Sequence, residues 1–142
     1  MILVDANLLI YAVVEEAPEH EAAVAWLDER MGGTARVGLP WPSLLAFVRV
    51  VANPRVLDRP LALPDAWRRV RGWLAQPPAW VPSPTDRHAD VLEDLLLPER
   101  APRLVPDAHL AALAIEHGLV LCSADRDFSR FAGLRWENPL SR

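Results

Sequence analysis

The chain has 142 residues, of which 51% are hydrophobic, so its length and composition suit one compact domain with a buried core. Its formal net charge of −4 at pH 7 argues against a protein that coats nucleic acid through bulk positive charge. Apart from the histidines, every basic side chain is an arginine; the absence of lysine excludes a P-loop and disfavours a magnesium-dependent phosphatase, whose chemistry usually needs a lysine.

The sequence has no secretory signal and no apolar stretch long enough to cross a bilayer, so we expect a cytoplasmic protein that does not enter the membrane. We expect one domain over residues 1–142. The single cysteine, Cys122, lies in an apolar run, which predicts a buried packing role and no chemistry.

Apolar residues at helical or strand spacing, separated by proline and glycine, predict elements in the following order. The first half contains strand 2–4, helix 21–31, strand 35–39, helix 41–53 and helix 64–74. The second half contains strand 80–82, helix 85–97 with Thr85 as its N-cap, loop 98–105, helix 106–117, strand 119–122 and strand 134–137. This alternation predicts an α/β fold with right-handed crossovers and a mainly parallel sheet covered by helices on both faces.

Two of the predicted strands lead into acidic residues. The first strand ends at Asp5, and the fourth leads into Asp125 and Asp127. Asp107 opens the helix that precedes the fourth strand. Because ligands of open parallel sheets bind beyond the carboxyl ends of the strands, we expect these side chains at one shared edge.

Carboxylates that converge at one edge repel one another unless a cation lies between them. Mg²⁺ and Mn²⁺ prefer oxygen ligands, and such ions commonly serve phosphodiester hydrolysis. The alternative interpretation is that Asp5 and Asp107 cap helices while Asp125 and Asp127 shape a turn. Their joint placement at strand ends favours the metal site. His109 lies two positions after Asp107 and so points to another helix face, where we expect packing or hydrogen bonding instead of metal ligation.

Three segments resemble the PIN domain, and most closely the VapC-type toxins of bacterial toxin–antitoxin pairs. These segments are ILVDANLLIYA at the start, PDAHLAALAIEHG around Asp107, and LCSADRDFSRFAGLRWENPL at the end. The resemblance extends over the whole chain. It implies a three-layer α/β/α sandwich, RNA cleavage that depends on Mg²⁺ or Mn²⁺, a homodimer, and inhibition by a cognate VapB-like antitoxin that covers the active site.

The resemblance also implies roles for individual residues. Asp5 matches the first acid of the family, and Asn7 matches its small polar follower. Asp107 matches the acid that opens the late helix, and Asp125 and Asp127 match the terminal D-x-D-F motif. We expect Asp5, Asp107 and Asp125 to bind metal directly. Asp127 is expected to bind the metal through water or to orient its neighbour.

One position departs from the family pattern. The family commonly has a glutamate three residues before an arginine, whereas this chain has Ala46 before Arg49. The missing anionic ligand is expected to weaken one metal ion more than another, so one-metal and two-metal sites both stay open. Ser43, one helical turn earlier, is expected to help through its hydroxyl or an ordered water. Arg49 contacts substrate phosphate, stabilises the carboxylate cluster or forms a structural ion pair. A catalytically weak PIN-like module that binds RNA or protein is the alternative function.

Overall fold

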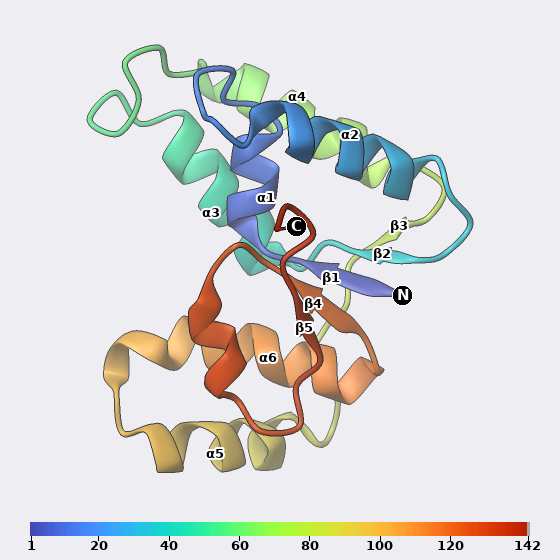
Figure 1. The fold of residues 1–142 in the computed structure, drawn as a ribbon, viewed down its shortest axis with the longest axis vertical. Helices are drawn as coiled ribbons and strands as arrows, with labels where there is room; N and C mark the ends of the chain where they lie inside the picture. The colour runs from blue at the N-terminus through green and yellow to red at the C-terminus, as the bar shows by residue number, and fades with distance from the viewer. Residues whose placement is uncertain (142) are drawn as a thin grey trace.

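The computed structural model describes residues 1–141 and has a central sheet of five parallel strands in the order β3-β2-β1-β4-β5 (Figure 1). β1 (Ile2–Val4) lies at the centre, between β2 (Val37–Gly38) and β4 (Val120–Cys122). The edge strands are β3 (Ala79–Trp80) and β5 (Trp136–Glu137). The prediction of a parallel sheet is confirmed, and β1 has the predicted bounds, whereas the other four strands are shorter than predicted.

Helices cover both faces of the sheet (Figure 1). One layer contains α1 (Ala6–Tyr11), α2 (His20–Met31), α3 (Trp41–Val51) and α4 (Leu63–Leu74). The other contains α5 (His88–Glu99), α6 (Val105–His117) and the 3-10 helices η1 (Pro102–Leu104) and η2 (Arg126–Arg130). The α/β class and its three-layer arrangement are therefore confirmed. No helix within residues 1–141 is long and apolar enough to cross a bilayer.

The central strand divides the core into two parts. Ile2 and Val4 pack in the cluster formed with α1 to α4, whereas Leu3 packs in the cluster formed with α5 and α6. This alternation follows from the two-residue period of a strand, and burying each such side chain stabilises the fold by about 1.5 to 3 kcal/mol. Cys122 is buried in the first cluster, and burial raises the pKa of its thiol to about 12, in agreement with a packing role.

The sequence predicts a loop over 98–105, and this prediction is wrong. α5 continues through Pro98 to Glu99, η1 follows, and α6 already begins at Val105. Pro98 is tolerated because it lies in the last turn, where the helix ends directly afterwards at Arg100 in the left-handed conformation (φ 53°). The short connection fixes η1 against the start of α6.

Thr85 is not the N-cap of α5, contrary to the prediction, because the helix begins three residues later; its Oγ1 accepts the Arg87 N–H at 3.2 Å in the preceding turn, and Thr85 is also bonded to Glu116 of α6. Its backbone N–H and its Oγ1 donate to Glu116 Oε1 at 2.9 and 2.6 Å, and α5 starts only at His88. His88 Nδ1 lies 2.6 Å from Glu116 Oε2, while its Nε2 lies 3.0 Å from His109 Nδ1. The hydrogen-bonding role predicted for His109 is confirmed, and the chain of contacts joins α5 to α6.

Candidate active site

The four predicted acids lie beyond the carboxyl ends of β1 and β4. Asp5 directly follows β1 and caps α1 by accepting the Ala6 N–H at 2.8 Å. Asp125 follows β4 and caps η2 by accepting the Asp127 N–H at 2.9 Å. Asp107 lies in the first turn of α6. The capping role considered for Asp5 is therefore real, whereas Asp107 is not the N-cap of α6, which is Leu104. The bonds of Asp5 and Asp125 to the backbone hold these carboxylates at the same edge of the sheet.

Three of the carboxylates form a compact group. Asp107, Asp125 and Asp127 each offer an oxygen within 4.8 Å of the others, and all three are partly exposed. Asp5 is outside this group, but its charge acts on Asp107. Burial, and to a smaller extent the charges of Asp5, Asp125 and Asp127, together raise the pKa of Asp107 to about 6 against the opposing effect of Arg103. The geometry thus concentrates negative charge around Asp107.

Two neutral side chains, in addition to the Ala6 N–H, fix the side chain of Asp5. Ser123 Oγ donates to Asp5 Oδ2 at 2.7 Å, and Asn7 Nδ2 donates to the same oxygen at 3.3 Å. Burial raises the pKa of Asp5, the hydrogen bonds from Ser123 and Ala6 lower it, and the charge of Asp125 raises it. Asn7 therefore orients the first acid, in addition to any contact with substrate.

Ser123 links the two strand ends and was not singled out by the sequence analysis. Its buried Oγ accepts from Asn7 Nδ2 at 3.0 Å and from the Asp125 backbone N–H at 3.0 Å, while donating to Asp5. One hydroxyl proton and two lone pairs are thus all used. The available signal was a polar residue directly after a buried strand, the same signal that identified Asp5.

Asp127 differs from the other acids because arginines contact it. Arg103 Nη1 donates to Asp127 Oδ2 at 3.1 Å, and Arg130 Nη2 lies 4.0 Å from Asp127 Oδ1. Arg130 Nη1 also lies 3.6 Å from Glu99 Oε2. Local sequence indicates no role for either arginine, because the contact between Arg103 and Asp127 joins residues 24 positions apart.

α3 carries the remaining predicted residues. It begins beyond the end of β2 and packs against α1. Ser43 is buried, and its Oγ has no hydrogen-bond partner among the described residues, whereas Ala46 is partly exposed and Arg49 is exposed. Within residues 1–141, no hydrogen bond or ion pair joins Ser43 or Arg49 to the four acids. The structure thus leaves a buried hydroxyl and an exposed guanidinium available on this helix.

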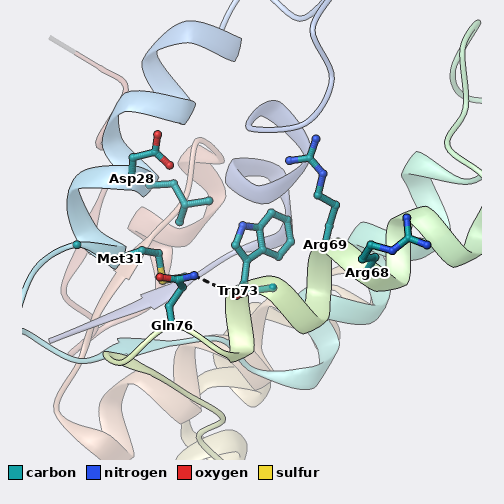
Figure 2. Close-up of a pocket in the computed structure, with 9 residues that line it drawn as sticks. Asp28, Met31, Arg68, Arg69, Trp73 and Gln76 are labelled. Atoms are coloured by element: carbon teal, nitrogen blue, oxygen red, sulfur yellow. Dashed lines mark hydrogen bonds between the residues drawn. The ribbon is translucent and has the colours of Figure 1, made fainter.

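A cavity of about 430 Å³ lies elsewhere, between α2 and α4 (Figure 2). Asp28 and Met31 of α2 border it on one side, and Arg69 and Trp73 of α4 border it on the other. None of the predicted site residues lines this cavity. It is therefore separate from the carboxylate edge.

The carboxylate edge has the donor chemistry of a site for a hard divalent cation. Its ligand atoms are carboxylate oxygens, which Mg²⁺ and Mn²⁺ prefer over the nitrogen and sulfur ligands favoured by zinc. Burial and three neighbouring carboxylates raise the pKa of Asp107, and the charge of Arg103 opposes them only in part. The residues present therefore fit a magnesium or manganese ion.

Comparison with known proteins identifies relatives over nearly the full chain. The family model for the PIN domain matches residues 2–134. Ribonuclease VapC37 of Mycobacterium tuberculosis is 46% identical over 140 residues, which cover 98% of this chain and 97% of that protein. Ribonuclease VapC33 of the same species is 42% identical over 141 residues, which cover 99% of each chain.

Two solved structures show the same fold at low sequence identity. VapBC2 from Rickettsia felis, bound to a DNA fragment from its promoter, matches with a TM-score of 0.69 at 15% identity, covering 97% of this chain and 98% of that chain. DNA-bound VapBC from Salmonella typhimurium matches with a TM-score of 0.66 at 17% identity, covering 98% and 99%.

Proposed function

Since the chain belongs to the PIN-domain family, we propose that it is a VapC-type endoribonuclease, the toxin of a VapBC-like toxin–antitoxin pair. The observation that carries the proposal is the group formed by Asp107, Asp125 and Asp127, whose oxygens lie within 4.8 Å of one another. Asp5 adds negative charge to this group from the neighbouring strand end. Identity of 46% to a ribonuclease over nearly the whole chain supports the same activity.

We propose that Asp5, Asp107 and Asp125 hold Mg²⁺ or Mn²⁺. When bound, the ion supplies Lewis acidity and neutralises charge during phosphodiester hydrolysis. Asp5 enters the site with its orientation already set by Ser123 and Asn7. This orientation favours binding because little side-chain freedom remains to be lost.

The other predicted residues have supporting roles in the proposal. Asp127 orients its neighbours. Asn7 contacts the substrate in addition to its hydrogen bond to Asp5. The Ser43 hydroxyl, which has no partner among the described residues, binds an ordered water. This water takes the place of the glutamate that the family commonly has at the position of Ala46. Arg49 contacts RNA phosphate, and its exposure on α3 leaves its guanidinium accessible for that purpose.

The partners follow from the same family membership. The two structural neighbours named above are VapBC proteins, which supports a VapB-like antitoxin as partner of this chain. RNA as substrate, a homodimer as the assembly and the cytoplasm as the location belong to the same proposal.

Ala46 motivates one alternative, a PIN-like module that binds RNA or protein with little or no catalysis. A cleavage assay on antitoxin-free protein separates the two functions. With Mg²⁺ or Mn²⁺, wild-type protein should cleave single-stranded RNA, and EDTA should stop the reaction. Asp5→Asn and Asp107→Asn should each slow cleavage by at least about 100-fold, or about 3 kcal/mol. Asp94→Asn, which changes an exposed acid of α5, is the matched control and should keep the wild-type rate.

Cleavage at the wild-type rate by Asp107→Asn would contradict the proposed site. Wild-type protein that binds RNA but leaves it intact with either ion would favour the binding module.

A further inference from the structure

Two arginines from separate segments converge on one carboxylate beside the candidate active site. Arg103 of η1 donates to Asp127 Oδ2 at 3.1 Å, and Arg130 at the end of η2 faces Asp127 Oδ1 at 4.0 Å. Glu99, at the end of α5, lies 3.6 Å from the other terminal nitrogen of Arg130. Each oxygen of Asp127 thus faces a different guanidinium.

The arginines lie next to the proposed metal ligands. Asp127 is the carboxylate they contact, and its oxygen lies within 4.8 Å of oxygens of Asp107 and Asp125. The charge of Arg103 also lowers the pKa of Asp107, so this guanidinium is close enough to affect the acidic group electrostatically. A phosphate bound by these arginines would therefore neighbour the scissile bond.

The ion pairs leave much of each arginine accessible. The side chains of Arg103 and Arg130 are 64% and 40% exposed, and a guanidinium has further N–H donors beyond those that face Asp127. Ion pairs this exposed contribute little to the free energy of unfolding, so stability alone does not explain why two arginines lie beside Asp127. A guanidinium held in place by a carboxylate is, however, well suited to bind phosphate through two parallel hydrogen bonds.

An RNA strand meets an electrostatic obstacle at this edge of the sheet. The chain has a net charge of −4, and four carboxylates gather where the substrate must approach. Phosphate groups are repelled by such a surface unless cations lie beside it. Arg103 and Arg130 are side-chain cations that contact the acidic group directly.

We propose that Arg103 and Arg130 form a binding site for an RNA backbone phosphate next to the scissile bond, with Asp127 as the residue that positions both. The inference rests on the proposed function, because RNA is the substrate proposed there. It assigns the second acid of the D-x-D-F motif a role in holding arginines, whereas the metal is held by Asp5, Asp107 and Asp125.

The test measures RNA affinity without cleavage. In an Asp107→Asn background, a short fluorescent single-stranded RNA is titrated by anisotropy at several salt concentrations. Arg103→Gln and Arg130→Gln should each weaken binding about fivefold to tenfold and reduce the slope of log affinity against log salt by about 0.7. Arg126→Gln removes the same charge from an exposed position of η2 and should weaken binding by less than about twofold.

Losses no larger than that of Arg126→Gln would overturn the inference, since general charge would then explain them. Lower thermal stability with an unchanged salt slope would also overturn it, because the arginines would then be structural. The inference can fail while wild-type cleavage persists, and the proposed function fails separately if Asp107→Asn alone still cleaves RNA.

Discussion

Two carboxylates at opposite ends of α6 have opposite environments. At the start of the helix, Asp107 is partly buried among other acids, and its pKa rises to about 6. At the end, burial raises the pKa of Glu116, but hydrogen bonds from Thr85 and His88 outweigh burial and leave the pKa below its usual value. The side chain of Glu116 is fully enclosed, at 0% exposure.

The contrast separates a structural carboxylate from a functional one. Glu116 has its donors within the fold, so its charge is compensated without any ligand. Asp107 has mainly like charges around it, and such an uncompensated acid in a partly open position is typical of a site that binds a cation. Opposite responses to mutation and pH are therefore expected from the two ends of one helix.

Removal of the structural carboxylate should have the largest effect on stability. Glu116→Ala leaves the Thr85 donors and His88 without their acceptor in an enclosed space, and it should lower the free energy of unfolding by about 3 kcal/mol. Glu93→Ala changes an exposed residue of α5 and should lower it by less than about 0.5 kcal/mol. Urea unfolding of both variants measures the difference, and equal midpoints would refute the structural role.

Loss of the hydroxyl that links the strand ends should mainly affect activity. Ser123→Ala removes the 2.7 Å hydrogen bond to Asp5 and frees that carboxylate to reorient. We expect cleavage to fall about tenfold, as for other residues that orient metal ligands. Ser129→Ala, an exposed serine of η2, is the control for initial-rate measurements. A Ser123→Ala enzyme as fast as this control would show that Asp5 needs no such support.

The pH dependence of stability should have opposite signs for the two carboxylates. The folded pKa of Asp107 lies above its unfolded value of 3.8, so its stabilising effect is present below about pH 4 and is lost as pH rises through about 6. In EDTA at pH 7, the free energy of unfolding of Asp107→Asn should therefore be about 1 kcal/mol larger than that of wild type. This value is already reduced to account for solvent screening of the half-exposed group. Below about pH 4 the two proteins should have equal stability.

Glu116 should behave in the reverse way, because its folded pKa is lowered. Its stabilisation is present above the unfolded value of 4.5 and is lost as pH falls through the folded pKa. The loss of stability caused by Glu116→Gln, relative to wild type, should thus become smaller as the pH falls. Urea unfolding across this pH range measures the stability of Asp107→Asn and Glu116→Gln relative to wild type. Differences from wild type that change in the same direction with pH would remove the distinction between the two sites.

The smallest effect concerns the position where the family commonly has glutamate. Ala46→Glu adds a carboxylate one helical turn before Arg49, and it should raise cleavage about threefold at low Mg²⁺ and less at saturating Mg²⁺. Leu45→Glu makes the same charge change at the preceding exposed residue and should bring no gain. An unchanged Mg²⁺ requirement in Ala46→Glu would show that the missing glutamate does not limit the site.

The acids at the strand ends could be predicted because local sequence determines them. Apolar runs predict the buried strands β1 and β4, and Asp5 and Asp125 follow those strands closely. Asp107 could be found in the same way, since it lies in the first turn of a helix with a clear pattern.

The contacts that orient these acids depend on residues far apart in the chain. Ser123 and Asp5 are separated by 118 positions, and Arg103 and Asp127 by 24. Sequence spacing does not reveal such pairs until the order and register of the strands are known. Thr85 shows the same limit, because its hydroxyl donates to a distant enclosed carboxylate, Glu116, a contact that local sequence does not reveal.

Crystals of the antitoxin-free protein grown with Mn²⁺ test the central claim most directly, because anomalous scattering locates the ion. The account predicts a peak about 2 Å from carboxylate oxygens of Asp107 and Asp125, on the side facing Asp5, and no such peak in Asp107→Asn. An active protein whose manganese lies away from these acids would contradict it.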